Sequence, residues 1–135
     1  MDWQLELVVV PVTDVDRAKR FYSEQVGFVV DHDSRFGDEL RIVQLTPPGS
    51  ACSIAVGTGI VATPPGSVEG MQLVVPDIEA ARAELVQRGV EVSGVQHYDG
   101  AVRVDGRGGD WNSFVFFSDP DGNAWAVQER PGSRG

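Results

Sequence analysis

The sequence predicts an α+β protein made of two consecutive β-α-β-β-β modules. Two repeated features carry this prediction. The strand end Val9–Asp14 (VVPVTD) resembles Leu73–Asp77 (LVVPD), and each leads into an amphipathic helix. The turn Thr46–Ser50 (TPPGS) resembles Asp119–Asn123 (DPDGN), and each precedes a final strand. A module of this size cannot bury its sheet face alone, so we expect the two modules to pair.

The first module is expected over about residues 5–58. Apolar runs bounded by turn residues predict strands over Leu5–Val12, Phe28–Asp31, Leu40–Leu45 and Ala51–Val56. Asp14 is placed to cap a helix that ends at Gly27. One face of that helix carries the apolar residues Val15, Ala18, Phe21, Tyr22 and Val26. The polar segment 33–39 is expected to connect the second and third strands.

A linker over about residues 59–68, rich in Gly, Pro and Thr, leads into the second module, expected over about residues 69–129. Its helix should carry Ile78, Ala81 and Leu85 and end at Gly89. Its strands are predicted over Met71–Val75, Ser113–Phe117 and Ala124–Gln128, with Val90–Val95 as a further candidate. The tail, residues 130–135, is expected to fray.

Composition excludes several classes of partner. The net charge is −9 and the chain contains one lysine, with its arginines mostly interleaved with acidic residues, so nucleic acid and anionic membranes are poor partners. The longest apolar run contains a proline and is far too short to span a membrane, and no signal peptide is recognisable. A single cysteine, Cys52, allows no intrachain disulfide, and a cytoplasmic location is expected.

Several of these motifs resemble those of a known protein family. The strand end Val12–Asp14, the helix with Phe21-Tyr22 and the following Gly27-Phe28 are similar to the first module of glyoxalase/bleomycin resistance/dioxygenase proteins, the vicinal oxygen chelate superfamily. The turn Ser118–Asn123 (SDPDGN) before a short apolar strand resembles the corresponding turn near their C-terminus. The resemblance covers residues 5–129. It implies a single domain over 1–135, with an open, eight-stranded, cup-shaped sheet around a ligand pocket, commonly in a homodimer.

In metal-dependent members of this family, His, Glu or Gln, His and Glu from the first, fourth, fifth and eighth strands hold a divalent cation. The matching positions here are Leu7, Ser53, Gly70 and Ala126. A serine hydroxyl is a weak donor and the other three offer no donor side chain. Shifting the register by one or two residues brings in Glu6, Gln72 or Gln128 but never three good ligands. The departure from the family pattern therefore predicts that the metal site is lost, and we expect no cofactor.

Few residues are candidates for acid/base chemistry. His97, beside Tyr98 and a glycine-rich stretch, is the candidate catalytic residue, and His32 is expected to be a solvated loop histidine. The stretch Gly100–Gly109 lacks a phosphate-loop ending. It is expected to be a flexible flap with Trp111 as a lid residue, or else a plain β-hairpin. Cys52 is expected to be an inert thiol.

Strand parity names the residues that should line the cup, because alternate residues of a strand share a face. The expected ligand-binding residues are Leu7, Val9, Ser53, Gln72, Val74, Trp111, Ala126 and Gln128. Trp125 has the opposite parity and should pack behind the sheet.

Three functions fit this pattern. The favoured hypothesis is a protein that sequesters a small apolar or aromatic molecule, as resistance proteins of this family do, since such a cup needs no acid or base. The first alternative is an enzyme of the lyase, isomerase or dioxygenase type, metal-free or with non-standard ligands, although fold alone does not convey chemistry. The second alternative is a structural or regulatory dimer whose cup is filled by its own side chains.

Overall fold

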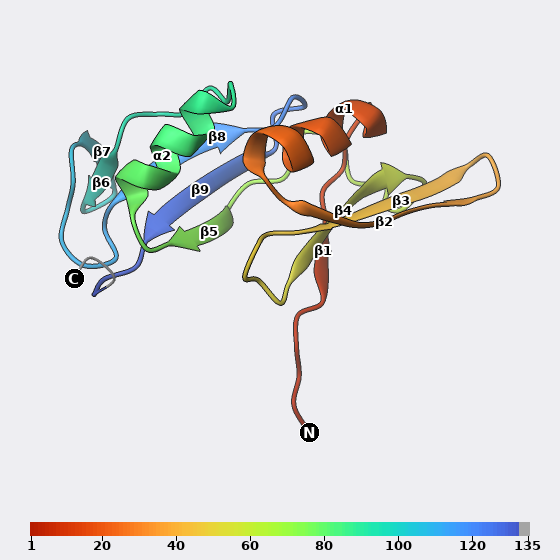
Figure 1. Cartoon of the computed structure of the whole chain (residues 1–135), viewed down its shortest axis with the longest axis horizontal. Helices are drawn as coiled ribbons and strands as arrows, with labels where there is room; N and C mark the ends of the chain where they lie inside the picture. Colours follow the sequence, from red (N-terminus) through yellow and green to blue (C-terminus); the bar gives the residue numbers. More distant parts are fainter. Residues whose placement is uncertain (133–135) are drawn as a thin grey trace. The chain divides into compact units, whose positions relative to one another are not determined.

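The computed structural model describes residues 1–132 and shows two sheets, each with a helix across one face (Figure 1). The chain divides into two compact units. Unit 1 contains Met1–Val68 and also the turn Asp119–Asn123, whereas unit 2 contains Glu69–Ser118 and the chain from Ala124 onward. Half of the tail expected to fray, residues 133–135, lies outside the described residues.

Unit 1 contains a four-stranded sheet in the order β1-β4-β3-β2. The strands are β1 (Leu7–Val9), β2 (Val29–Phe36), β3 (Leu40–Thr46) and β4 (Ser53–Thr58). β1 runs parallel to β4, while the other neighbours are antiparallel. The fully buried side chains Val10, Val43, Leu45 and Val56 form the core of this unit with the helix that follows β1. Short turns explain the antiparallel pairs, because a parallel pair needs a long crossover.

The helix of unit 1 begins and ends where the sequence predicts, but its second half is a π-helix. α1 (Val15–Arg20) starts after Asp14, whose carboxylate accepts a hydrogen bond from the Arg17 amide at 3.0 Å. It continues as η1 (Phe21–Val26) and stops at Gly27, whose φ is 95°. The consecutive residues Phe21 and Tyr22 are both buried.

Unit 2 contains a five-stranded sheet in the order β5-β9-β8-β6-β7. The strands are β5 (Met71–Val75), β6 (Gln96–Asp99), β7 (Val102–Asp105), β8 (Phe114–Ser118) and β9 (Ala124–Glu129). α2 (Ile78–Gln87) is capped by Asp77 and lies across β8 and β9 (Figure 1). Ile78, Leu85 and Trp125 are buried, and the rings of Trp125 and Phe117 stack with their centroids 5.9 Å apart.

The fold class is confirmed, whereas several predicted boundaries are wrong. β1 ends earlier than predicted, since Pro11 has no amide hydrogen to continue the ladder, and Leu5 is 70% exposed. β2 extends to Phe36, so the expected polar connection is largely strand. No strand covers 90–95, where Val92 makes one isolated bridge to Phe117. The described residues form nine strands in two sheets, of which β6 and β7 lie outside every strand that the sequence predicts.

Candidate functional site

Each sheet has one face covered by its helix and one face without a helix. The cross-strand register defines the residues of the first helix-free face: Leu7, Val9, His32, Ser34, Ile42, Gln44, Thr46, Ser53, Ala55 and Gly57. The register of unit 2 defines the second helix-free face: Gln72, Val74, Gln96, Tyr98, Arg103, Asp105, Phe114, Phe116, Ser118, Ala124, Ala126 and Gln128. Neighbours in a register row point to the same side of a sheet.

A chain of side-chain hydrogen bonds crosses the first helix-free face. Thr46 bonds to Asp31, and its hydroxyl oxygen lies 2.7 Å from that of Ser53. The Gln44 amide nitrogen lies 3.3 Å from the Ser53 oxygen, and its amide oxygen lies 3.1 Å from Nε2 of His32. The hydroxyl of Ser34 completes the chain at 3.4 Å from Nδ1 of His32. This face is therefore apolar at Leu7 and Val9 and polar beside them.

His32 corrects a sequence-based expectation. It is exposed, as expected, but it lies inside β2, where it pairs with Gln44, and not in a loop. The interpretation failed because the residues around it, Asp31 and Asp33, are polar and do not suggest a strand. The second and third strands are joined by a tight turn, so β2 gains residues that read as loop.

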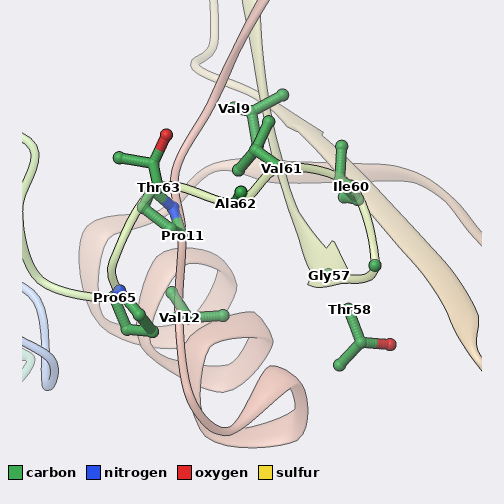
Figure 2. A pocket seen from close by; sticks show the side chains of 11 residues that line it. Val9, Pro11, Val12, Gly57, Thr58, Ile60, Val61, Ala62, Thr63 and Pro65 are labelled. Carbon is green, nitrogen blue, oxygen red and sulfur yellow. The ribbon is translucent and has the colours of Figure 1, made fainter.

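Unit 1 also contains a pocket of about 290 Å³ (Figure 2). Val9, Pro11 and Val12 line it together with the segment 57–65, apart from Pro64. Gly57 is required here, because a Cβ on it would meet the Arg41 carbonyl oxygen at 1.9 Å and Ile60 at 2.7 Å. Its absence lets the segment after β4 fold back closely and form the wall of the pocket.

The second helix-free face carries a cluster of aromatic rings. Phe114 and Phe116 stack with their centroids 5.9 Å apart, and Tyr98 meets them edge-on at 5.4 and 6.4 Å. The Arg103 guanidinium lies 4.0 Å from the centre of the Phe116 ring. Phe114 is buried, whereas Phe116 is half-buried and Tyr98 is exposed. We call Tyr98, Phe114 and Phe116 the aromatic cluster.

The predicted residues Gln72, Val74, Ala126 and Gln128 lie on this same face. Gln72 donates a hydrogen bond to Gln128 at 2.9 Å, and Gln128 donates one to the Trp111 carbonyl at 2.8 Å. The parity argument therefore placed these side chains on the correct side of the sheet, and Trp125 on the other side. Their role in binding stays a prediction.

The glycine-rich stretch is anchored, and part of it forms a hairpin. Val102–Asp105 pairs with β6, as the hairpin alternative predicts. The Arg107 side chain binds the Glu129 carboxylate, which also accepts a hydrogen bond from the Ile78 amide at 2.9 Å. Asn112 donates to the Tyr98 carbonyl and accepts from its amide. Trp111, 53% exposed, is thus fixed at its backbone.

His97, the candidate catalytic residue, points away from the aromatic cluster. His97 lies in β6, where it pairs with Val104 of β7 and directly precedes Tyr98. Consecutive residues of a strand point to opposite sides, so the side chains of His97 and Tyr98 lie on opposite faces of the sheet. Its Nδ1 lies 2.9 Å from the Gly106 carbonyl oxygen. Gly108 approaches it so closely that a Cβ there would lie 2.8 Å from that of His97. The structure therefore does not bring His97 together with the expected ligand-binding residues.

The residues at the family's metal positions do not fit a metal ion. In unit 1, Leu7 pairs with Ser53, whose oxygen is already engaged by Gln44 and Thr46. In unit 2, Ala126 pairs with Gln72, and Gly70 precedes β5 with a φ of 82°. Among residues 1–132, no group of three His, Cys, Asp or Glu side chains is placed to hold a metal. These positions offer neither carboxylate nor imidazole.

This fold and these faces define a class of protein, and comparison with known proteins identifies it. The family model described as Glyoxalase/Bleomycin resistance protein/Dioxygenase superfamily matches residues 4–127. The chain therefore belongs to the glyoxalase/bleomycin resistance protein/dioxygenase superfamily. No helix within residues 1–132 is long and apolar enough to cross a membrane.

Solved structures from Streptomyces sp. CB03234 are similar to this chain. TnmS3, an antibiotic binding protein, is 33% identical with a TM-score of 0.77, covering 96% of this chain and 97% of its own. A glyoxalase/bleomycin resistance protein from the same organism is 34% identical with a TM-score of 0.72, covering 93% and 99%. The uncharacterized protein YetH of Bacillus subtilis (strain 168) is 27% identical over 93% of this chain and 98% of its own.

Sequence reasoning missed several residues on these faces. Gln44 could have been found, because it alternates with the buried residues of the predicted strand 40–45. Phe114 and Phe116 lie in the run SFVFF, which has apolar residues on both faces of the strand. Alternation therefore does not indicate which of its side chains lie on the helix-free face. Tyr98 had no signal, since the strand that holds it was not predicted.

Proposed function

We propose that this protein binds a small apolar or aromatic molecule and sequesters it without chemical turnover. The observation that carries the proposal is the aromatic cluster on the second helix-free face. Stacked and edge-on rings offer a surface that a planar ligand can join, and each such ring contact contributes about 0.5–1.5 kcal/mol beyond area burial. The guanidinium of Arg103 over Phe116 extends this surface.

The polar groups around the cluster suit orientation of a ligand and not catalysis. Gln72 and Gln128 are neutral amides, bonded to each other. His97 lies on the opposite face. Apolar pockets commonly orient ligands with a few such polar groups. Sequestration needs binding energy and no acid or base, so this set of residues is sufficient for it.

The similarity to an antibiotic binding protein supports the same proposal. TnmS3 is 33% identical over 96% of this chain. We carry over the class of ligand, a small organic antibiotic, and no particular compound. As further parts of the proposal, the protein acts in the cytoplasm as a homodimer, which sedimentation would show as roughly twice the 14.6 kDa chain mass.

A thermal-shift screen tests the proposal, because a ligand that binds the native state raises the melting temperature. The panel holds bleomycin, an anthracycline as a planar polycyclic antibiotic, and the methylglyoxal–glutathione adduct as an enzyme substrate. Each is measured with and without a chelator. We expect the planar compound to raise the melting temperature by the same amount with and without chelator. The compound should also be recovered chemically unaltered.

Phe116→Ala should weaken this binding at least tenfold, since it removes the central ring of the cluster. Val86→Ala on the exposed side of α2 is the matched control and should bind like the wild type. Turnover of the adduct, or stabilisation that disappears with chelator, would contradict the proposal. Equal binding by both variants would place the ligand elsewhere.

A further inference from the structure

The outer strand of the second sheet, β7, has an open edge. It ends the strand order β5-β9-β8-β6-β7, so within residues 1–132 it has a neighbouring strand on one side only (Figure 1). All four of its residues, Val102–Asp105, are exposed. An exposed edge strand presents a row of backbone N–H and C=O groups and is a template for pairing with a further strand. A strand of another molecule can therefore extend this sheet.

The hydrogen bonds around β6 show which backbone groups of β7 point outward. Neighbours in an antiparallel pair alternate between residues that exchange both backbone hydrogen bonds and residues that exchange none. The Gly106 amide donates to the Val95 carbonyl at 2.8 Å, which sets this alternation directly after β7. Tyr98 pairs with Arg103, but the Tyr98 amide and carbonyl are bonded to a side chain on their other side. Arg103 and Asp105 therefore turn their N–H and C=O groups away from β6.

The side chains of β7 alternate between charged and apolar. Arg103 and Asp105 lie on the second helix-free face and carry opposite charges. Val102 and Val104 point to the other face, where they are 65% and 38% exposed. The helix on that side, α2, lies across β8 and β9. The strand thus combines one apolar side with a positive and a negative charge two residues apart.

This pattern is complementary to itself in one antiparallel register. When two copies of β7 pair about a two-fold axis at Val104, Arg103 lies opposite the partner's Asp105, and the symmetry repeats this pair. The outward backbone groups of both residues then form the hydrogen-bonded pairs, and the two Val104 side chains meet between them. An axis at Arg103 or at Asp105 would place like charges opposite each other, which is destabilising. The charges therefore select the register centred on Val104.

We propose that β7 is an interface for a second copy of this chain, paired antiparallel about a two-fold axis at Val104 and closed by two ion pairs between Arg103 and the partner's Asp105. In the single chain the Arg103 guanidinium lies over Phe116, so it turns toward the new edge on pairing. Asp105 accepts a hydrogen bond from the Gln96 amide and has a second carboxylate oxygen for the partner's Arg103. The inference rests on the homodimer part of the proposed function and names the strand through which two copies meet.

Charge reversal tests the register, because a two-fold axis places each substitution twice in the interface. Sedimentation equilibrium of the full chain measures the dissociation constant of the dimer. Arg103→Asp and Asp105→Arg each bring like charges opposite one another and should raise that constant at least tenfold. The double variant Arg103→Asp/Asp105→Arg restores opposite charges and should return the constant close to its wild-type value. A double variant that dissociates as readily as the single variants overturns the inference.

A disulfide at the two-fold axis gives an independent readout. Val104 and the partner's Val104 form a pair without backbone hydrogen bonds, in which the Cα atoms are about 4.5 Å apart and within the range of a disulfide. Val104→Cys in a Cys52→Ser background should therefore form a covalent dimer in oxidised glutathione. Val102→Cys, at a more exposed position, is the matched control. It lies roughly 13 Å along the strand from the partner's Val102 and should run as a monomer in denaturing electrophoresis.

Failure of this inference is distinguishable from failure of the proposed homodimer. A dimer whose dissociation constant is unchanged by both single reversals overturns the inference and leaves the homodimer standing. The same holds for a dimer in which Val104→Cys forms no more disulfide than Val102→Cys. A wild-type chain that sediments at the monomer mass of 14.6 kDa overturns both. Ligand binding is measured separately by thermal shift, so none of these outcomes decides it.

Discussion

Trp111 shows how one residue of a candidate site can hold an unfavourable backbone conformation. Among residues 1–132 it is the non-glycine residue with a positive φ, 60°. A side chain in this region costs about 1–2 kcal/mol, and such residues cluster at functional sites. Its carbonyl is held by Gln128, and its neighbour Asn112 is bonded to Tyr98. The exposed indole is therefore attached to a backbone that is hydrogen-bonded to the second helix-free face through Gln128.

Two substitutions of Trp111 separate its backbone from its ring. Trp111→Gly and Trp111→Ala both remove the indole, but glycine adopts a positive φ without strain. We expect the glycine variant to be more stable than the alanine variant by about 1 kcal/mol in urea denaturation, and both to bind the planar antibiotic less well than the wild type. Equal stability of the two variants would contradict backbone strain at Trp111. If both variants bound the antibiotic as well as the wild type does, Trp111 would not be part of the binding site.

Single residues were predictable where alternation in a strand was clear. Gln72 and Gln128 lie on the face that parity assigned to them. Gln44 is not among the residues predicted at the family's metal positions or beside them, although the same alternation applies to it. The hydrogen-bond chain could not be predicted at all, since it joins residues of three strands whose register the sequence does not specify.

At the scale of elements, the turn Asp119–Asn123 acts as part of unit 1 although it lies late in the sequence. Asp119 accepts hydrogen bonds from the Tyr22 hydroxyl and the Asn123 amide, both at 2.8 Å. Asn123 is fully buried, donates to the Pro11 carbonyl and accepts from the Val68 amide. The turn thereby satisfies backbone hydrogen-bonding groups at Pro11 and Val68.

Asn123→Ala should lower the free energy of unfolding by about 2–4 kcal/mol, because it leaves the Pro11 carbonyl and the Val68 amide without this partner. Urea denaturation measures the loss. Asp110→Ala, at an exposed position, is the control and should change stability by less than about 0.5 kcal/mol. A similar small effect for Asn123→Ala would mean that the turn does not stabilise unit 1.

The helix-covered face of the first sheet contains an ion-pair network with a predictable pH response. Hydrogen bonds from Arg41 lower the pKa of Asp33 well below its usual range, against an opposing effect of burial and with help from Lys19. The folded-state pKa is therefore below the unfolded one. The stabilisation is complete above the unfolded pKa, about 4, and is lost as pH falls through the folded pKa.

Stability measured in urea should accordingly fall between about pH 4 and pH 2. Asp33→Asn should be less stable than the wild type at pH 7 and show a smaller fall over this range. Asp38→Asn, in the exposed turn between β2 and β3, should keep the wild-type slope. A wild-type slope in Asp33→Asn would show that other carboxylates cause the acid response.

Helices and strands were predicted well where the local sequence pattern is strong, and poorly where a segment becomes a strand only by pairing with a neighbouring strand. Met71–Val75 and the Asp14 and Asp77 caps were predicted correctly because apolar runs and capping residues are local features. β2 and the β6–β7 hairpin consist of polar or glycine-bounded segments, which become strands because a neighbouring strand offers its backbone groups.

At the scale of the whole molecule, the sequence predicts two modules that each begin β-α; unit 1 has the predicted β-α-β-β-β order, whereas unit 2 contains one strand more. Membership of the superfamily is shown by the family model that matches residues 4–127. The two units have since diverged in what they offer a ligand. Unit 1 combines a pocket with a chain of side-chain hydrogen bonds, whereas unit 2 offers an aromatic cluster beside two amides. Neither unit retains a metal-binding side chain at the family's positions. Recognition by ring contacts and hydrogen bonds is the chemistry common to both.

The central claim, binding without turnover or metal, is tested most directly by one measurement. The dissociation constant of the stabilising planar antibiotic is determined with metal-free and metal-supplemented protein, and the bound compound is then released and weighed by mass spectrometry. The same dissociation constant in both preparations and full recovery of the unmodified compound are expected. A product of altered mass, or binding that appears only with added metal, would contradict the claim.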